Sequence, residues 1–286
     1  MKILVIGLGL IGGSISKALK KYTAHEVGGF DIHPEIIDTA LNEQAIDKIA
    51  GEDNFCDYDV LFICTNPLYI EDFLKTYAAF FKKGTIIADV GGVKGSLPDE
   101  MTEFCLKDGL FYVSAHPMAG KERPGYLNSD ADLFKEANFI ITPVSKSCES
   151  AMIAIEEIAK EIGFRNFNRI SPDEHDRIIA YTSQLAHVIS ATYVKSPALE
   201  KEKGFTGGSF QDMTRIATMN EEMWSTLFSL NRDKLITEID IFTKNLLKFR
   251  HTLAENNEKE LKDLIYESRI LKENDLKNTA CLTRFD

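Results

Sequence analysis

The first half of the chain alternates short apolar runs, rich in β-branched residues, with longer stretches of helical periodicity. The apolar runs predict strands at residues 2–6, 26–30, 60–64, 85–88, 110–113 and 139–142, and a short strand near 164–167. Between them, apolar residues recur on one face of predicted helices at 11–20, 35–42, 70–81 and 149–162. Because this alternation is typical of parallel sheets, we expect a doubly wound, mainly parallel α/β sheet.

After residue 170 the strand pattern stops, and only helical periodicity remains, with helices predicted at 177–194, 222–230 and 234–253. Ser171 and Glu174 form an S-x-x-E capping box with Pro172 at the first helical position. We therefore predict an α/β domain of residues 1–169 and an all-helical domain of residues 170–286. The predicted helix 177–194 is apolar on all sides and needs burial on several faces, which a homodimer would provide.

A glycine-rich motif lies between the first predicted strand and the first predicted helix. It matches G-x-G-x-x-G, and this strand–helix context is the one in which the motif binds a dinucleotide. The first glycine permits the tight turn, the second lets a pyrophosphate approach the backbone, and the third allows the helix to pack on the strand. The predicted cofactor-binding residues are Gly7, Leu8, Gly9, Leu10, Ile11 and Gly12. They predict a Rossmann-type fold.

Asp31 follows the last of these glycines by 19 residues, at the end of the second predicted strand. A carboxylate at this spacing is expected to bind a ribose 2′-hydroxyl and to repel a 2′-phosphate, so NAD is favoured over NADP. Asp31 could instead cap the helix that begins at Pro34, and the two roles can coexist.

A polar turn follows the predicted strand 60–64, at the sheet edge where ligands bind in such folds. It is interpreted either as lining the nicotinamide side of the cofactor site or as a simple helix-entry turn. Its residues are Thr65, Asn66 and Pro67.

Composition narrows the functional classes. The chain has 286 residues, 33 of them basic and 44 acidic, and its formal net charge of −11 argues against a nucleic-acid partner. No apolar run approaches the roughly 18 residues of a membrane span, so no membrane partner is expected. The five cysteines are scattered without a C-x-x-C pair, which fits reduced thiols better than disulfides or zinc ligands. We expect an untargeted cytoplasmic protein.

His116 follows a predicted strand, so we expect it on a loop at the same sheet edge as the cofactor. Histidine is well suited to accept a proton from an alcohol near neutral pH, as a dehydrogenase requires. Its activity would then decline on the acid side of a pKa near the usual histidine value of about 6.5. Taken alone, a loop histidine before a proline is more often a turn residue.

Several motifs together resemble the prephenate dehydrogenase family. The resemblance covers most of the chain and is most specific in its second half. It rests on residues 7–14, DVGGVKG at 89–95, HPMAG at 116–120 with Glu122, Ser183 with His187, and GGSFQDMTRIA at 207–217 followed by Met223 and Trp224.

The resemblance implies an NAD-binding domain followed by an all-α dimerisation domain, and NAD-dependent oxidation of prephenate to 4-hydroxyphenylpyruvate with loss of CO2. It makes His116 the proton acceptor and Arg215 the group that binds a substrate carboxylate. It also places Ser183 as a hydrogen-bond donor to the substrate, His187 near the substrate and Glu122 at the pocket mouth. Without the resemblance, Arg215 and Glu122 would be ordinary surface charges, and His187 would be a core residue. Trp224 is interpreted as helical core, and His175 as a first-turn residue outside the site.

Two positions depart from the family pattern. Gly92 replaces a serine common in relatives, whose hydroxyl helps to orient the catalytic histidine or the substrate; water, Ser114 or Ser183 could take over. Gln184 stands where many relatives have histidine.

Three other functions remain open. The nearest is an arogenate dehydrogenase, which performs the same chemistry on an amino analogue of prephenate. A non-catalytic dinucleotide sensor is more distant, because His116 and Arg215 are retained. A β-hydroxyacid dehydrogenase would use a catalytic lysine in the helical half, and no matching motif is found there.

Overall fold

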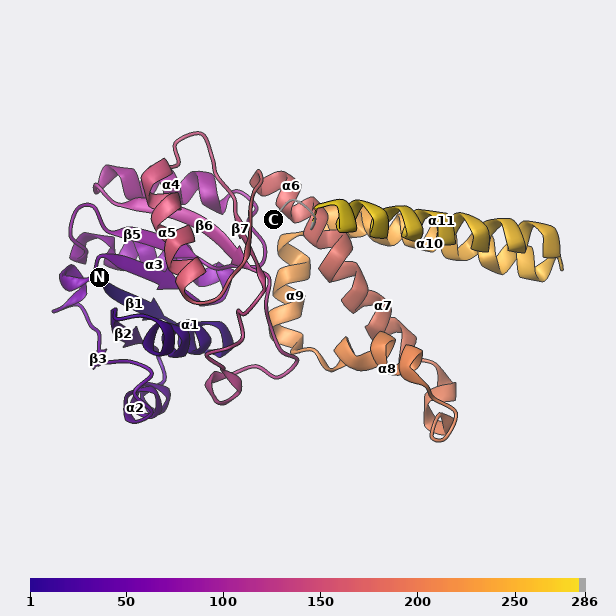
Figure 1. Cartoon of the computed structure of the whole chain (residues 1–286), viewed down its shortest axis with the longest axis horizontal. Helices are drawn as coiled ribbons and strands as arrows, with labels where there is room; N and C mark the ends of the chain where they lie inside the picture. The colour runs from indigo at the N-terminus through magenta and orange to yellow at the C-terminus, as the bar shows by residue number, and fades with distance from the viewer. Residues whose placement is uncertain (283–286) are drawn as a thin grey trace. The chain divides into compact units, whose positions relative to one another are not determined.

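The computed structural model describes the backbone of residues 1–282 and the side chains of residues 1–277. Within this part, one eight-stranded sheet has the order β3-β2-β1-β4-β5-β6-β7-β8 (Figure 1). Its neighbouring strands are parallel except β6 and β7, which are antiparallel. The strands are β1 (Lys2–Ile6), β2 (Glu26–Phe30), β3 (Lys48–Ile49), β4 (Val60–Ile63), β5 (Ile86–Asp89), β6 (Phe111–Pro117), β7 (Asn138–Ile141) and β8 (Asn166–Arg169).

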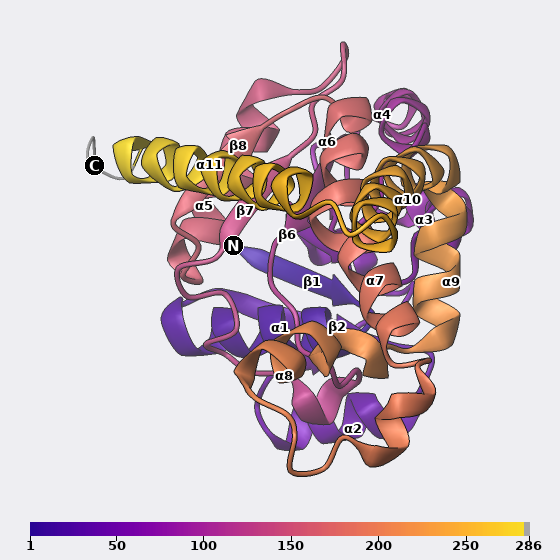
Figure 2. The ribbon, with the colours of Figure 1, turned by 90° about the vertical axis from the view of Figure 1, so that its right-hand side faces the viewer.

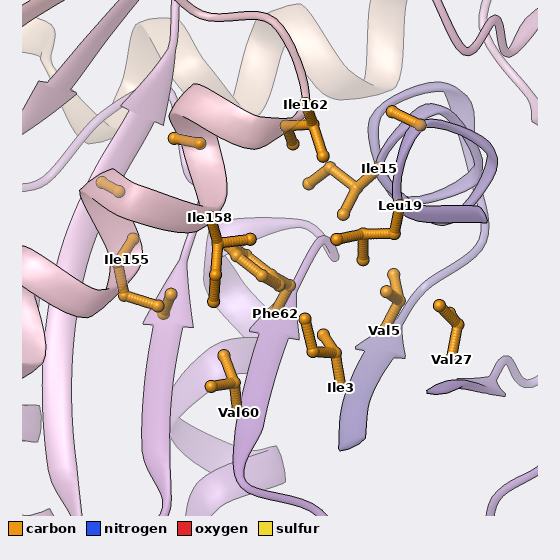
Figure 3. Close-up of a cluster of buried hydrophobic side chains, with 14 of the residues drawn as sticks. Ile3, Val5, Ile15, Leu19, Val27, Val60, Phe62, Ile155, Ile158 and Ile162 are labelled. Atoms are coloured by element: carbon orange, nitrogen blue, oxygen red, sulfur yellow. The ribbon is translucent and has the colours of Figure 1, made fainter. Parts of the chain in front are cut away.

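Helices cover both faces of this sheet, because its inner strands are apolar on both sides. One face packs against α1 (Leu10–Tyr22), α2 (Pro34–Asn42) and α5 (Glu149–Glu161). The other packs against α3 (Ile70–Tyr77) and α4 (Leu97–Lys107). Figure 3 shows the first core, where side chains of β1, β2 and β4 meet α1 and α5; the labelled residues are Ile3, Val5, Ile15, Leu19, Val27, Val60, Phe62, Ile155, Ile158 and Ile162. The doubly wound, Rossmann-type sheet predicted from the sequence is confirmed.

The chain from residue 172 to residue 282 is helical, as predicted. A capped helix begins it, since Ser171 Oγ accepts a hydrogen bond from the Glu174 N–H at 3.3 Å. Figure 2 shows α7 beside α9, and the Gln184 side chain donates to the Leu227 carbonyl at 2.9 Å. The elements are α6 (Pro172–Ile179), a π-helical turn (Ala180–Gln184), α7 (Leu185–Tyr193), a 3-10 turn (Pro197–Lys201), α8 (Gly208–Thr214), a second 3-10 turn (Arg215–Thr218), α9 (Glu221–Leu230), α10 (Arg232–Ala254) and α11 (Glu258–Leu282).

The chain forms two compact units, residues 1–234 and residues 235–286. The first unit contains the sheet and the helices through α9, and the second contains most of α10 together with α11. The boundary predicted near residue 170 marks the change from strands to helices, and it stays a prediction. Among the described residues, no helix is long and apolar enough to cross a membrane.

Four elements were not predicted from the sequence: β3, α4, α8 and α11. Two-residue β3 is defined by its pairing with β2, where Lys48 lies opposite Gly28, and not by its own apolar pattern. The helix α11 has low amphipathicity because charged residues surround it, which obscures the periodicity on which the prediction depends. Cys281 lies outside the described side chains.

Candidate active site

The glycine loop between β1 and α1 has the geometry of a dinucleotide cradle. Gly7 has a φ of +82°, and a Cβ on Gly12 would lie 1.9 Å from the Gly7 carbonyl oxygen, so both positions require glycine. A Cβ on Gly9 would meet nothing within 4 Å. The loop therefore closes tightly on itself at Gly7 and Gly12 and stays open at Gly9, where α1 begins. This open helix N-terminus fits a pyrophosphate.

Asp31, one residue beyond β2, braces this loop. One carboxylate oxygen accepts the Leu8 N–H at 2.6 Å, and the other accepts the His33 N–H at 3.0 Å in the turn before α2. The local turn role and the position expected for a ribose contact therefore coexist. Carboxylate oxygens have further lone pairs, so these bonds leave Asp31 able to accept from a ribose hydroxyl.

The turn after β4 lies against the glycine loop. A Cβ on Gly7 would lie 3.0 Å from Thr65 Cγ2, and a Cβ on Gly91 would lie 3.4 Å from Pro67 Cγ. Asn66 Oδ1 accepts the Leu68 N–H at 3.0 Å and caps a short 3-10 turn, Pro67–Tyr69. The helix-entry role of this turn is thus present, and its contact with the nicotinamide stays a prediction.

The structure corrects the expected position of His116, which lies within β6 and not on a loop. Antiparallel pairing with β7 places His116 opposite Ile140 and extends β6 to Pro117. The sequence of β6 alone does not show this extension, because it depends on a partner strand more than 20 residues later. His116 still lies beside the sheet edge, since a Cβ on Gly92 would lie 3.6 Å from His116 Nε2.

A buried histidine of α6 contacts Nδ1 of the His116 ring, and a buried aspartate of α6 contacts that histidine. His116 Nδ1 and His175 Nε2 are 2.9 Å apart, and His175 Nδ1 lies 2.7 Å from Asp176 Oδ1. Both α6 residues are about 1% exposed. His175 does lie in the first turns of α6, as expected, but the sequence interpretation missed its contact with His116. No sequence signal indicates it, because the two histidines are 59 residues apart.

A buried ion pair joins Lys94, in the loop after β5, to Asp89 at the end of β5. Lys94 Nζ donates to Asp89 Oδ1 at 2.8 Å and to the Ala115 carbonyl at 2.6 Å, while Tyr112 donates to the other Asp89 oxygen at 3.0 Å. Burial holds the pKa of His116 well below its usual value, and the charge of Lys94 acts in the same direction. The structure therefore revises the pKa expected from the sequence downward. His116 is neutral near pH 7 and can act as a base.

The helical half contributes an ion pair that links it to the loop after β6. Arg215 NH1 donates to Glu122, while the Arg215 side chain remains 61% exposed. A hydrogen bond from its own backbone N–H and the bond from Arg215 lower the pKa of Glu122. The two residues expected at the substrate pocket are thus brought together, although they are 93 positions apart.

The side chain of His187, a residue of α7, packs against α9. Its ring stacks on Trp224 with centroids 3.6 Å apart, and Nδ1 donates to the Ser183 carbonyl at 2.9 Å. Burial lowers the pKa of His187, and the nearby charge of Arg215 lowers it further. Trp224 is therefore a stacking partner of His187. Ser183 lies in the π-helical turn, a feature frequent at functional sites, and its predicted role as a donor to the substrate stays a prediction.

The two departures from the family pattern have distinct surroundings. Gly92 lies between the His116 ring and Leu227 of α9, whose Cδ2 would be 4.0 Å from a Cβ at this position. Gln184 is buried and bonds both the Leu227 carbonyl and Asn231 Nδ2, so it fastens α9 to the π-helical turn. The Ser114 hydroxyl is buried without a hydrogen-bond partner among the described residues.

Comparison of the chain with known protein families gives a match to one family. The model described as "prephenate dehydrogenase, nucleotide-binding domain" matches residues 15–167, and that described as "prephenate dehydrogenase, dimerization domain" matches residues 171–267. The chain belongs to the prephenate dehydrogenase family. The resemblance found in the sequence motifs is confirmed, and so is the expectation of a dehydrogenase with a nucleotide-binding domain.

Individual members of the family support the same assignment. The chain is 31% identical to prephenate dehydrogenase of Bacillus subtilis over 261 residues, which cover 87% of this chain and 69% of that protein. It is also 31% identical to cyclohexadienyl dehydrogenase of Zymomonas mobilis, with 88% of each chain covered. The crystal structure of Aquifex aeolicus prephenate dehydrogenase, in complex with hydroxyphenyl propionate and NAD+, superposes with a TM-score of 0.85 at 26% identity, over 96% of this chain and 98% of that one.

Proposed function

We propose that this family member catalyses the NAD-dependent oxidative decarboxylation of prephenate to 4-hydroxyphenylpyruvate, CO2 and NADH. The observation that carries the proposal is the neutral His116, whose Nε2 faces the Gly92 loop beside the glycine cradle. The name of the Bacillus subtilis relative supports prephenate as substrate, and the Aquifex aeolicus complex supports NAD.

In this mechanism the chain supplies a proton acceptor and a cation for the substrate carboxylate, and it positions the substrate beside the cofactor. Bound NAD supplies the acceptor for the hydride that leaves the ring carbinol carbon. His116 Nε2 takes the hydroxyl proton as the hydride leaves, the ring carboxylate departs as CO2, and its bonding electrons make the ring aromatic. The proton returns from His116 to the ring oxygen, which gives the phenol. Catalysis therefore rests on positioning and on one proton acceptor.

Arg215 is the cation that we assign to a substrate carboxylate. Prephenate carries two carboxylates, whereas the chain has a net charge of −11, so a local cation is needed. The planar guanidinium can bind a carboxylate through two parallel hydrogen bonds. Its hydrogen bond to Glu122 supports this assignment, because the Arg215 guanidinium already binds one carboxylate through NH1. His187 and Ser183 complete the proposed substrate site, with Glu122 at its mouth.

NAD is proposed over NADP because of Asp31. Its carboxylate lies at the end of β2 beside the glycine loop, where a 2′-phosphate would bring a like charge close to it. The residues that follow it, Ile32, His33 and Pro34, include no arginine that could compensate.

Arogenate is the second candidate substrate. The Zymomonas mobilis relative, which covers as much of this chain as the Bacillus subtilis enzyme does, is named a cyclohexadienyl dehydrogenase. Arogenate differs from prephenate only in an amino group that replaces the side-chain keto group. The chemistry at His116 would therefore be unchanged.

Steady-state kinetics with both substrates and both cofactors tests these proposals. We expect kcat/KM to be highest for prephenate with NAD+, and His116→Asn to lower kcat at least 100-fold, because general-base catalysis contributes about 10²–10⁴-fold. Preference for arogenate would replace the substrate assignment. A His116→Asn enzyme that keeps most of its turnover would refute the role of His116, and absence of turnover with either substrate would favour a dinucleotide sensor.

We also propose that the protein is a homodimer. The second unit, which contains most of α10 together with α11, leaves many large apolar side chains 37–66% exposed, more than a solvated helical hairpin needs. The helix predicted at 177–194 is less exposed, since Ile179 and Leu185 are buried within the chain. The exposed residues are Ile236, Ile241, Phe242, Leu246, Leu247, Leu253, Ile265, Tyr266, Leu271 and Leu276. Light scattering at micromolar concentration should give twice the chain mass; a monomer would refute the proposal.

A cytoplasmic location is proposed from the cysteines. Cys56, Cys64, Cys105 and Cys148 are all free, as expected for a reducing compartment. Fractionation of the native cells should recover the activity with cytoplasmic markers.

A further inference from the structure

We propose that Asp176 and His175 form a positioning relay that holds His116 in the one neutral tautomer able to accept the substrate proton. The inference rests on the proposed role of His116 as the proton acceptor. It adds two buried residues that act through His116.

The relay begins at Asp176, whose carboxylate can only accept. Its Oδ2 accepts the Gly95 N–H at 2.8 Å, and its Oδ1 accepts the Lys94 N–H at 3.0 Å. These bonds and the bond from His175 lower the pKa of Asp176 despite its burial, so the carboxylate is ionised. Because an ionised carboxylate has no proton to donate, His175 Nδ1 must carry the proton in the 2.7 Å contact with Asp176.

The proton on His175 Nδ1 determines which atom donates and which accepts in the hydrogen bond between His175 and His116. In neutral His175, Nε2 is then a bare acceptor, and the 2.9 Å contact requires a proton on His116 Nδ1. His116 Nε2 is left unprotonated on the side of Gly92. This is the nitrogen that the mechanism needs as a base. The opposite tautomer would present an N–H to the substrate hydroxyl and could not take its proton.

Burial stabilises this arrangement of protons on the two histidines. His175 and Asp176 are about 1% exposed, so water does not compete for their bonds. Lys94 also lies beside the relay, because its backbone N–H donates to Asp176, and its side chain bonds Asp89. The Lys94 charge opposes any additional proton on His116. The relay thus keeps His116 neutral and Asp176 negative.

The decisive variant is Asp176→Asn. Its amide oxygen is needed by the backbone N–H groups of Gly95 and Lys94, so its NH2 group turns toward His175 Nδ1. His175 must then carry its proton on Nε2, and His116 must carry its own on Nε2 as well. We expect kcat to fall at least 100-fold, while the KM of the substrate and the Kd of NAD+ stay within threefold. A comparable aspartate-to-asparagine change in a serine protease triad lowers kcat by about 10⁴ through the wrong tautomer.

Substitutions of His175 provide a matched pair. His175→Gln keeps an amide oxygen that can accept from His116 Nδ1, whereas His175→Leu removes the acceptor and retains comparable bulk. If the relay sets the tautomer, the glutamine variant keeps at least ten times the kcat of the leucine variant at similar thermal stability. Equal kcat values in the two variants would contradict the relay.

Histidine ¹⁵N NMR of the full-length protein tests the tautomer without any substrate. The His116 signals are assigned by their loss in His116→Asn. At pH 8 we expect a protonated Nδ1 and an unprotonated Nε2 on His116, reversed in Asp176→Asn. A proton on Nε2 in the wild-type protein, or an Asp176→Asn enzyme with kcat within threefold of wild type, would overturn the proposal. If Asp176→Asn fails to fold, the wild-type spectrum and the His175 pair still decide.

The two proposals fail in different ways. A wild-type protein with the expected tautomer but no turnover of prephenate or arogenate would refute the proposed function and leave the relay standing. An active enzyme with the opposite tautomer would refute the relay alone.

Discussion

Alanine substitutions at Gly9 and Gly12 should separate cofactor binding from the stability of the fold. Both glycines belong to one loop, and each substitution adds a single methyl group. The Gly9 backbone has φ −78° and ψ −152°, which alanine adopts without strain, and its new Cβ would meet no atom within 4 Å. At Gly12 the new Cβ would lie 1.9 Å from the Gly7 carbonyl oxygen and 3.1 Å from Cys64 Cβ.

The expected magnitudes follow from these distances. Overpacking costs about 1–3 kcal/mol, and Gly12→Ala should reach the upper end because it must displace backbone. Since 1 kcal/mol shifts Tm by about 2–4 °C in a domain of this size, its Tm should fall by about 6–12 °C. Gly9→Ala should leave the Tm of the free protein within about 2 °C. Its methyl group would occupy the space for the pyrophosphate, so NAD+ binding should weaken at least about tenfold, or 1.4 kcal/mol.

Two assays are sufficient. Thermal unfolding without cofactor measures the change in stability, and a fluorescence titration with NADH measures the change in affinity. The reasoning is refuted if Gly9→Ala binds the cofactor as tightly as wild type, or if it melts as low as Gly12→Ala. The first result would mean that the space at Gly9 is not the cofactor site, and the second would mean that this space is not open.

Three further predictions concern the substrate side. Arg215→Ala should raise the KM of the substrate at least tenfold with a smaller loss of kcat, and Arg215→Lys should be intermediate; steady-state kinetics giving an unchanged KM would contradict the carboxylate role. Gly92→Ser should raise kcat/KM about 2–10-fold over the matched Gly92→Ala, because its hydroxyl can add one hydrogen bond, worth about 0.5–1.5 kcal/mol, near His116 Nε2; equal values would show that the hydroxyl finds no partner. Because the pKa of His116 is depressed, the base form persists to lower pH, and kcat/KM should stay level from pH 8 through about 6.5 and decline only below it. A pH profile with its midpoint at or above about 6.5 would argue against this.

Features that depend on residues close together in the chain could be predicted from the sequence. The G-x-G-x-x-G loop, the capping box at Ser171 and the alternation of strands and helices each depend on neighbours within one or two elements. Local backbone geometry and apolar periodicity determine them, so the α/β sheet and its nucleotide loop could be predicted. The family motifs identified His116 and Arg215 as candidate site residues, and the structure shows where these residues lie.

The contacts that complete the site depend on tertiary packing. The chain itself does not show that β6 extends through His116, because the antiparallel partner β7 makes that extension. Nor does it show that His175 meets His116, or that Arg215 meets Glu122, across 59 and 93 positions. Such contacts arise only when the sheet buries both of its faces and α6 packs against the loop of Lys94 and Gly95. The sequence thus determined the sheet and its nucleotide loop, while packing between distant segments decided the surroundings of the base, because hydrogen bonds between remote residues form only after the backbone has been brought together.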